Sequence, residues 1–516
     1  MNLSNIEINE QFAKAIKLME EGENPVFITG RAGTGKSTLL EYFRATTKKE
    51  VVVLAPTGVA AVNISGQTIH SFFRFKPNIT LDKAKKIAGK LRKFDDDEIY
   101  QKLGIIIIDE VSMVRADLLD CVDQFLRITR KRHGTPFGGA KMIFIGDLYQ
   151  LPPVVTSSER EIFAHHYKSP YFFSAHVFPQ ISLEFIELEK IYRQRDDKFI
   201  QILNSIRNNS VADAEINTLN RRFDPKFEPS HEFYVYLATI NAKAAEINSE
   251  RLSRLKAKEK IFDGFVDGEF ETNALPTDVE LKLKVGAQVM LLNNDSLFRW
   301  VNGTIGKVVN IGEDEISVEL PNGNVEDVGL YKWEMFEYSL DKTKQTITSK
   351  KAGSFTQIPV KLAWAITIHK SQGKTFDRII LDLERGTFAA GQAYVALSRC
   401  RTLEGIVLKY KFQKRHVIVD WRIVKFLTEF QYNISEKNVP LEEKMNILRD
   451  AIENNKKLKI TYLKAQDVKS RRVVQPMELG TMEYLGKEFL GIKCYCHTRK
   501  EGRTFRVDRI LEMEIA

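Results

Sequence analysis

The chain has 516 residues, with 77 Lys and Arg against 68 Asp and Glu, and a formal net charge of +9 at pH 7. This length predicts about three or four domains, and 43% hydrophobic with 28% charged residues is typical of a globular protein with more than one core. The first residues lack a basic segment followed by an apolar core, and no run approaches about eighteen apolar residues. A secretion signal and a membrane span are therefore not expected, and we expect a cytoplasmic protein, nucleoid-associated if bacterial.

The positive charge is concentrated at the end of the chain. Residues 449–516 hold fifteen Lys and Arg against ten Asp and Glu. Polyanions such as nucleic acid are plausible partners, although many basic proteins bind no nucleic acid.

The four cysteines are sparse, and two of them, Cys494 and Cys496, occupy alternate positions of an apparent strand. No second pair stands at zinc spacing, so buried reduced thiols are favoured over a metal site.

The first predicted element is a helix from about residue 9, with apolar residues at helical spacing, ended by Gly22 and Pro25. Gln11, at its start, could hydrogen-bond an adenine edge. A surface glutamine fits the spacing equally well.

The next stretch carries the motif on which the other predictions depend. An apolar run, Val26–Ile28, leads into GRAGTGKST and a helix, which is the context that a phosphate-binding loop requires. Glycines let the backbone N–H groups converge on an anion at a helix N-terminus. Lys36 is expected to reach the β- and γ-phosphates, and Ser37 to ligate magnesium. The residues expected to bind the nucleotide in this loop are Gly33, Thr34, Gly35, Lys36, Ser37 and Thr38. A glycine-rich loop without this role is the alternative, and the complete spacing disfavours it.

A buried strand over Val51–Leu54 is followed by a turn and a helix. Thr57 and His70 stand at the ends of elements, where they can grip a nucleic-acid phosphate. A lone histidine is more often structural. Residues 74–102, lysine-rich and then acidic, are predicted to form an insertion, and such a charge run is usually a solvated face.

Four isoleucines, Ile105–Ile108, indicate the interior strand of a parallel sheet. Asp109 and Glu110 follow at its carboxyl end, where ligands bind. Asp109 is placed to hold magnesium and Glu110 to polarise the attacking water. An acidic pair is a weak signal alone and becomes strong beside a complete phosphate loop.

A third strand, Met142–Ile145, ends in Asp147 and Gln150, and Gln150 can sense a γ-phosphate or orient water. Three strand ends that carry polar groups toward one crevice indicate a RecA-type α/β lobe.

A second lobe is predicted from Tyr192–Gln194 onward, before an amphipathic helix. Alternating β-rich runs and glycine turns indicate a small antiparallel barrel between Asn293 and about Ala352. Gly373-Lys374-Thr375 fails the spacing of a second phosphate loop.

A polar cluster at a later strand end suits a sugar-phosphate backbone, and its members are Thr367, His369, Lys370, Ser371 and Gln372. Arg399 could cross a cleft between the lobes as an arginine finger. A surface arginine without a catalytic role is equally compatible with its spacing.

Together these motifs resemble the petite-integration-frequency (Pif) DNA helicases of the 5′-to-3′ branch of superfamily one, related to RecD. The ordered matches are GRAGTGKST, APTGVAAVNISGQTIHSFF, IIIIDEVSM, TPFGGAKMIFIGDLYQLPPV, YRQRDDKFIQILNSIR, AITIHKSQGKTFD and AYVALSR, over roughly the first 425 residues.

The resemblance implies an α/β fold with two RecA-like lobes, parallel sheets and an inserted Src-homology-3-like barrel. ATP and Mg²⁺ would bind between the lobes on Lys36, Ser37 and Asp109. The further catalytic residues that it implies are Glu110, Gln150, Arg193 and Arg399, with Gln11 on the adenine. The residues that it places on single-stranded DNA are Thr57, His70, Thr367, His369 and Lys370, with residues 74–102 as a strand-separating wedge.

The terminal block is similar to a WYL domain, a small β-barrel module, with the naming tripeptide altered to Glu488-Phe489-Leu490. Arg503 and Arg506, interleaved with Phe505 and Tyr495, suit a single strand on which bases stack. Aromatic residues in a small barrel more often form its core.

We therefore expect these parts: 1–180, the first lobe; 181–293 and 352–428, the second lobe; 294–351, the inserted barrel; 429–445, a linker; and 446–516, the WYL-like domain. The expected function is that of an ATP-dependent 5′-to-3′ DNA helicase that acts on single-stranded DNA and on tailed or forked duplex DNA. We expect the motor to be a monomer. The alternative is an ATP-gated nucleic-acid-binding regulator without processive unwinding.

Overall fold

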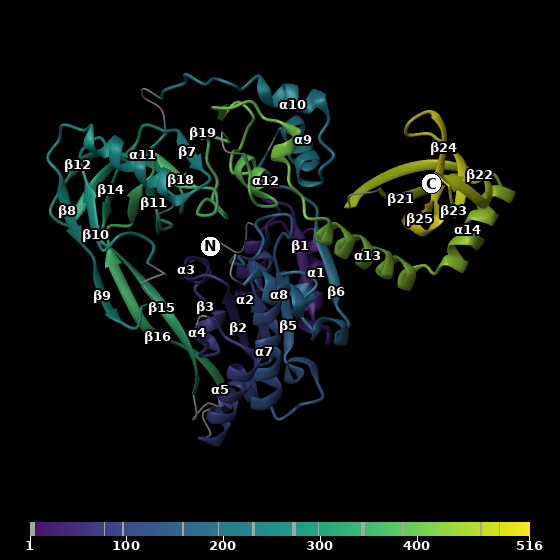
Figure 1. Ribbon diagram of the computed structural model, residues 1–516, viewed down its shortest axis with the longest axis horizontal. Helices are drawn as coiled ribbons and strands as arrows, with labels where there is room; N and C mark the ends of the chain where they lie inside the picture. The colour runs from purple at the N-terminus through teal and green to yellow at the C-terminus, as the bar shows by residue number, and fades with distance from the viewer. Residues whose placement is uncertain are drawn as a thin grey trace. The chain divides into compact units, whose positions relative to one another are not determined.

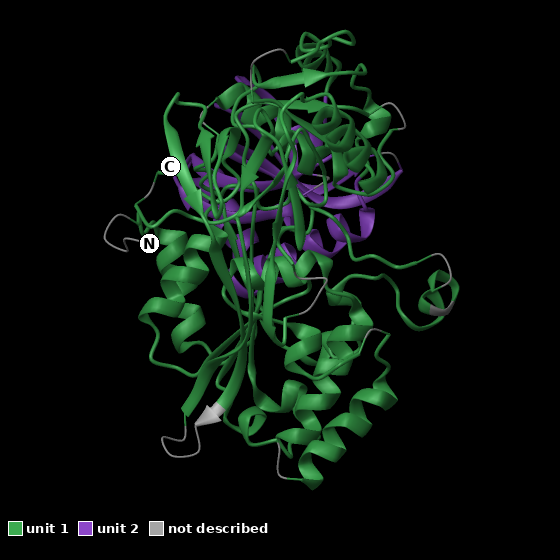
Figure 2. Ribbon diagram, turned by 90° about the vertical axis from the view of Figure 1, so that its left-hand side faces the viewer, with its two compact units in different colours: residues 1–204, 212–418 green, residues 205–211, 419–516 purple. Residues whose placement is uncertain are grey.

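The computed structural model describes residues 6–516 except 77, 95–96, 157–158, 195, 230–232, 271–274, 298, 342–345, 384–385, 465–466 and 485. It divides into two compact units, 1–204 with 212–418, and 205–211 with 419–516 (Figure 2).

The larger unit contains a six-stranded, wholly parallel sheet in the order β3-β2-β4-β5-β1-β6 (Figure 1). Its strands are β1 (Val26–Gly30), β2 (Val51–Ala55), β3 (Gln67–Thr68), β4 (Ile105–Ile108), β5 (Lys141–Ile145) and β6 (Glu184–Leu188). All four residues of β4 are buried because both faces of the sheet are covered. The predicted α/β fold with a parallel sheet is thereby confirmed. Strand β6 pairs with β1 although it follows residue 180, where the first lobe was expected to end.

Helices connect these strands. They are α1 (Glu10–Glu21), α2 (Lys36–Thr46), α3 (Gly58–Asn63), α4 (Ile69–Phe72), α5 (Leu81–Lys93), α6 (Glu98–Lys102), α7 (Ala116–Thr129) and α8 (Arg160–His166). Helix α1 begins where the Asn9 side chain accepts a hydrogen bond from the Phe12 amide, and its apolar residues Phe12, Ala15 and Met19 join the sheet core.

A second parallel sheet, in the order β18-β7-β19-β20, forms the other lobe of this unit. Its strands are β7 (Val235–Ala238), β18 (Ala365–Thr367), β19 (Ile379–Leu381) and β20 (Ile406–Leu408). The neighbouring helices are α9 (Asp197–Arg207), α10 (Asp213–Asn220), α11 (Asn241–Ser253) and α12 (Gln392–Leu397).

Antiparallel sheets are inserted into the second lobe, in the orders β14-β13-β12-β11-β17, β15-β16-β9 and β10-β8. Their strands are β8 (Lys260–Asp263), β9 (Phe265–Gly268), β10 (Glu280–Leu283), β11 (Gln288–Leu291), β12 (Ile305–Ile311), β13 (Glu315–Glu319), β14 (Val325–Gly329), β15 (Tyr331–Asp341), β16 (Thr346–Gln357) and β17 (Val360–Leu362). Among the described residues these sheets are open, and the sheet of β11 and β17 extends beyond the range 294–351 that was expected to hold the barrel.

The long hairpin β15–β16 reaches from these sheets to the first lobe, toward α4 and α5 (Figure 1). There the Tyr338 hydroxyl accepts a hydrogen bond from the Val53 amide at 3.1 Å. The Ile347 amide donates to the Glu50 carboxylate at 2.9 Å. The hairpin therefore lies against the edge of the first sheet near β2.

The expected insertion, residues 74–102, contains α5 and α6, while Asp95 and Asp96 of its acidic run lie outside the described residues. An aromatic cluster fixes this segment to α7. Phe125 is fully buried, and its ring centroid lies 5.2 Å from Phe73, 5.7 Å from Phe75 and 4.7 Å from Tyr100.

The smaller unit contains α13 (Trp421–Asn438), α14 (Leu441–Glu453) and an antiparallel sheet in the order β24-β23-β22-β21-β25. Its strands are β21 (Leu458–Lys464), β22 (Val468–Tyr484), β23 (Lys487–Cys496), β24 (Glu501–Arg506) and β25 (Ile510–Ile515). Pairing of β24 with β25, which would close a barrel, is not found in the described part of this sheet.

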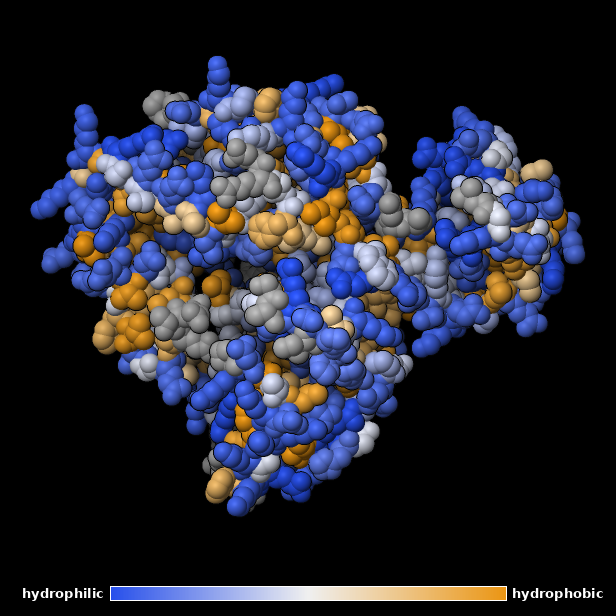
Figure 3. Space-filling model, in the orientation of Figure 1, coloured by the Kyte–Doolittle hydropathy of each residue, from blue (hydrophilic) through white to orange (hydrophobic). Residues whose placement is uncertain are grey.

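On the face shown in Figure 3, hydrophilic residues predominate and hydrophobic ones form small separate groups. None of the helices that the structure describes combines the length and apolar composition needed to cross a membrane.

We predict that Phe125→Ala lowers stability by about 3–5 kcal/mol, because it removes a buried ring from three aromatic contacts. A fall in the thermal unfolding midpoint of the full chain measures this. Phe125→Leu, which retains most of the volume, should cause a smaller fall, and equal falls for both variants would contradict the role assigned to the cluster.

Candidate nucleotide and nucleic-acid sites

The phosphate loop lies between β1 and α2 and has the backbone that its glycines predict. Gly33 and Gly35 have φ values of +83° and +86°, in the left-handed region where a side chain is strained. A Cβ atom on Gly33 would lie 2.4 Å from the Cβ of Arg193, so the second lobe approaches the loop as closely as glycine permits.

Lys36 begins α2 and bends back over the loop. Its ammonium donates hydrogen bonds to the carbonyls of Gly30 at 2.8 Å and Arg31 at 3.0 Å. Burial lowers its pKa, and the nearby carboxylates of Asp147 and Glu110 oppose that effect. Ser37, one residue on, is exposed and available to a ligand, and Thr38 is half-buried.

The acidic pair follows β4. Asp109 is 8% exposed, and burial together with the Glu110 carboxylate raises its pKa. One of its oxygens accepts a hydrogen bond from the Glu110 amide at 2.9 Å. Glu110 itself has φ 50°, a conformation that costs energy in a residue other than glycine.

Gln150 follows β5 and is 6% exposed. Its amide nitrogen lies 3.4 Å from the fully buried Asp147 carboxylate. Asp147, Gln150 and the acidic pair therefore gather at the carboxyl ends of β4 and β5, beside the phosphate loop.

The second lobe contributes two groups to the loop. The Tyr192 amide donates to the Gly33 carbonyl at 2.8 Å, which places Arg193 against the loop. One guanidinium nitrogen of Arg193, Nη1, is buried and has no hydrogen-bond partner in the described structure. From α12, the Tyr394 hydroxyl accepts a hydrogen bond from the Ala32 amide at 3.0 Å.

Arg399 is directed into the second lobe. It donates to the carbonyls of Val395 at 2.9 Å and Lys374 at 3.2 Å and to the Ser398 hydroxyl at 2.9 Å. Its guanidinium therefore stabilises the turn that follows β18 and ends near Lys374.

Gln11 lies in the first turn of α1, and its side-chain oxygen accepts a hydrogen bond from the Glu189 amide at 2.9 Å. Asn9 beside it donates to the Tyr192 hydroxyl at 3.2 Å. Gln11 is therefore tied to the segment that leads into Arg193.

These residues fit a nucleoside triphosphate. The glycine loop, in which Thr34 is 3% exposed, offers backbone donors at a helix N-terminus. The Cβ of Arg193 lies against the same loop, and one of its guanidinium nitrogens is buried without a partner in the described structure. A cluster of three or more His, Cys, Asp or Glu side chains able to hold a metal by themselves is not found among the described residues.

The residues expected to contact nucleic acid come from both lobes. Thr57 caps α3, where its hydroxyl accepts from the Ala60 amide at 3.3 Å. His70 lies half-buried in α4, and burial lowers its pKa, which favours the neutral ring.

In the second lobe, Thr367 ends β18, and its hydroxyl accepts a hydrogen bond from the Lys370 amide at 3.3 Å. Lys370 is exposed. The His369 ring is stacked on the exposed Phe388, with centroids 6.4 Å apart. A cation and two rings are thus available to a sugar-phosphate strand here.

In the smaller unit, Arg503 pairs with Glu501, and Arg506 pairs with Asp508 at 2.7 Å. Both arginines are thus already paired with acidic residues two positions away. Phe505 is 7% exposed and belongs to the core, as the alternative for the aromatic residues predicts.

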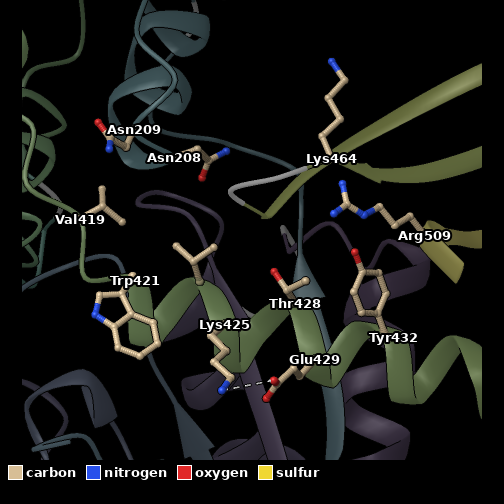
Figure 4. Close-up of a pocket in the computed structure, with 11 residues that line it drawn as sticks. Asn208, Asn209, Val419, Trp421, Lys425, Thr428, Glu429, Tyr432, Lys464 and Arg509 are labelled. Carbon is tan, nitrogen blue, oxygen red and sulfur yellow. Dashed lines mark ion pairs between the residues drawn. The ribbon is translucent and has the colours of Figure 1, made fainter. Parts of the chain in front are cut away.

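A pocket of about 460 Å³ lies elsewhere in this unit (Figure 4). Figure 4 shows the Tyr432 hydroxyl pointing toward Arg509 at one end, with Lys464 nearby, and Trp421 at the other end. Trp421 is 68% exposed.

Two parallel-sheet lobes that meet at one phosphate loop define a P-loop motor ATPase of the helicase class. The chain belongs to the Pif1 helicase family. A family model described as "PIF1-like helicase" matches residues 5–217, "DNA helicase Pif1, 2B domain" matches 269–311, and "WYL domain" matches 443–515.

The chain is 33% identical over 448 residues to the ATP-dependent DNA helicase Pif1 of Bdellovibrio bacteriovorus, covering 84% of this chain and 94% of that protein. It is 32% identical to human PIF1 over 438 residues, covering 81% of this chain and 63% of the human protein. Among solved structures, Bacteroides sp Pif1 in complex with ADP-AlF4 is 38% identical with a TM-score of 0.76, covering 83% of this chain and 98% of the other. The chain uses ATP, as its family does.

Sequence reasoning missed Tyr394 and gave Gln372 no catalytic role. The tyrosine in the run AYVALSR was the available signal for Tyr394. Gln372 was assigned to the polar cluster that suits a sugar-phosphate backbone, and its contact with the other lobe was not predicted.

We predict that Lys36→Ala lowers ATP turnover about 10²–10³-fold, because it removes the cation from the phosphate site, and leaves the affinity for single-stranded DNA unchanged. Steady-state hydrolysis and fluorescence anisotropy measure the two quantities. Lys48→Ala, at an exposed lysine beyond the end of α2, is the matched control. Loss of DNA affinity in the Lys36 variant would contradict the separation of the two sites.

Proposed function

We propose that this chain is an ATP-dependent helicase that moves 5′ to 3′ along single-stranded DNA and separates duplex DNA ahead of it. The supporting observation is the position of Arg193, whose Cβ lies against the phosphate loop of the other lobe and whose guanidinium has one buried nitrogen without a hydrogen-bond partner in the described structure. A γ-phosphate is the group that this nitrogen suits, so bound ATP would hold the lobes together and its hydrolysis would release them.

The catalytic groups have separate tasks in this proposal. Lys36 and Arg193 bind the phosphates, while Glu110 orients the attacking water and Gln150 senses the γ-phosphate. Arg399 acts indirectly, because it stabilises the turn of the second lobe through its hydrogen bond to the Lys374 carbonyl. Magnesium would be held by Ser37 and Asp109 together with the phosphates, and when bound it neutralises developing charge.

The strand would run across both lobes, on Thr57 and His70 in one and on Thr367, His369 and Lys370 in the other. A solved structure of Bacteroides Pif1 bound to single-stranded DNA supports this class of substrate, as does a structure of Pif1 helicases described for unwinding at forked duplex DNA. If both lobes grip in turn, each cycle of ATP advances the protein along the strand.

The finer architecture also belongs to this proposal. We propose that the inserted sheets form a Src-homology-3-like barrel, that residues 74–102 form the wedge, and that one chain suffices as the motor. One related structure is described as two coordinating Pif1 helicases at forked DNA, so a mass measurement on the DNA complex is needed. The WYL domain would aid strand binding or regulation through Arg503, Arg506 and the pocket beside Arg509.

We predict unwinding of duplexes with a 5′ single-stranded tail in the presence of Mg²⁺ and ATP, and none with a 3′ tail. A strand-displacement assay with both substrates measures this, with Lys36→Ala as the negative control. Unwinding from 3′ tails alone would overturn the proposed direction.

The second candidate is an ATP-gated regulator in which the WYL domain supplies the function. For the helicase, in contrast, we predict that ATPase stimulation increases with the length of the single strand. A translocating motor takes more steps on a long strand before it reaches the end and dissociates. Poly(dT) oligonucleotides of graded length test this. Stimulation that saturates at the length of one binding site would favour the regulator.

A further inference from the structure

Gln372 joins the two functional sites. It belongs to the turn after β18 that carries His369 and Lys370, and its side-chain amide donates a hydrogen bond to the Glu110 carboxylate at 3.2 Å. The two residues are 262 positions apart and come from different lobes. One contact therefore connects the predicted strand-binding turn with the predicted water-orienting carboxylate.

Glu110 is held firmly at this contact. Its backbone adopts the left-handed conformation with φ 50° and ψ 42°. The amide of Glu110 is fixed by the Asp109 carboxylate, and its own carboxylate is fixed by Gln372. A residue in a costly conformation persists where its surroundings impose it, so removal of one restraint changes the position of the carboxylate.

The turn that carries Gln372 is rigid. The Ser371 amide donates to the Thr367 carbonyl at 2.9 Å, and the buried Ser371 hydroxyl donates to the Ile368 carbonyl at 2.7 Å. The Gln372 amide donates to the His369 carbonyl at 3.2 Å. Because these bonds tie the turn into one body, displacement of Lys370 by a phosphate also displaces Gln372.

The second lobe supports this turn from behind. Arg399 donates to the carbonyls of Ser371 and Lys374, at 3.5 and 3.2 Å, on either side of Gln372. Arg399 follows α12, whose Tyr394 contacts the phosphate loop. The turn is therefore mechanically connected with the nucleotide site by two routes, through Glu110 and through α12.

The arrangement resembles the DNA-free state of a relative. TM-scores to Bacteroides Pif1 are 0.76 with ADP-AlF4 and 0.74 without ligand, against 0.58 with single-stranded DNA. The hydrogen bond between Gln372 and Glu110 therefore occurs in a structure that is more similar to these two forms of Bacteroides Pif1 than to its complex with single-stranded DNA.

We propose that Gln372 is a positioning residue that restrains Glu110 while no strand is bound and releases it when DNA displaces the turn. This inference rests on the proposed function. An amide donor engages a lone pair of the carboxylate and fixes its direction, so Glu110 is less able to orient water and accept its proton. Strand binding removes the donor, and ATP hydrolysis to ADP and phosphate then proceeds faster.

The test uses the full chain with Gln372→Met, which is similar in size and lacks the donor, and Gln372→Ala. We predict that ATP turnover without DNA rises about tenfold in both, the size expected for one hydrogen bond to a charged group. Turnover at saturating single-stranded DNA should remain that of the wild type. The affinity for the strand should rise by a similar factor, because DNA no longer has to break this hydrogen bond when it binds. The stimulation by DNA therefore falls because the DNA-free rate rises, and a general loss of structure would not raise that rate.

Gln124→Ala is the matched control, because that glutamine also donates to a carboxylate, Asp123, at 3.2 Å. In a Glu110→Gln background, Gln372→Met should produce no rise. An unchanged DNA-free rate in both Gln372 variants, or an equal rise in the Glu110→Gln background, would overturn the inference. If the wild type unwinds 5′-tailed duplex while the Gln372 variants leave the DNA-free rate unchanged, the inference fails and the proposed function stands. A wild type that neither unwinds DNA nor is stimulated by it would overturn both.

Discussion

The close approach of the second lobe to Gly33 is the constraint on which the rest of the motor depends. A side chain at Gly33 would collide with Arg193, and the Gly33 carbonyl accepts the Tyr192 amide. Glycine is therefore needed at this position for two reasons. It allows the backbone to turn its amides toward a phosphate, and it leaves room for Arg193. This contact places Arg193 of the second lobe beside the phosphate loop of the first.

The parallel sheets explain why the remaining groups converge. The carboxyl ends of β4 and β5 deliver Asp109, Glu110, Asp147 and Gln150 to one edge, and the end of β18 delivers the turn with Lys370. Ligands bind at such edges because the helices that follow point their N-termini there. The hydrogen bonds within the turn and from Arg399 restrain it, as the proposed connection between strand and nucleotide requires.

The sequence was most informative where a local rule determines the structure. Four isoleucines predicted a strand covered on both faces, and the spacing from Gly30 to Ser37 predicted the loop. The direction in which a side chain points was harder to predict. The spacing of Arg399 does not reveal that its side chain points into the second lobe. The contacts of Tyr394 with Ala32 and of Gln372 with Glu110 depend on how the lobes pack, which no local pattern encodes. The pairing of Arg503 with Glu501 was not predicted, although residues two apart on a strand share a face. Asp508, which pairs with Arg506, lies in a 3-10 turn after β24, where the strand rule does not apply.

The hairpin β15–β16 covers a margin of the first sheet, which bears on the solubility of the protein. Tyr338 and Ile347 occupy hydrogen-bonding groups beside β2, near the margin of a sheet whose strands are strongly apolar. Open margins of this kind recruit strands from other molecules. By covering this margin, the hairpin of one lobe limits access of strands from other molecules to an apolar sheet edge of the other lobe.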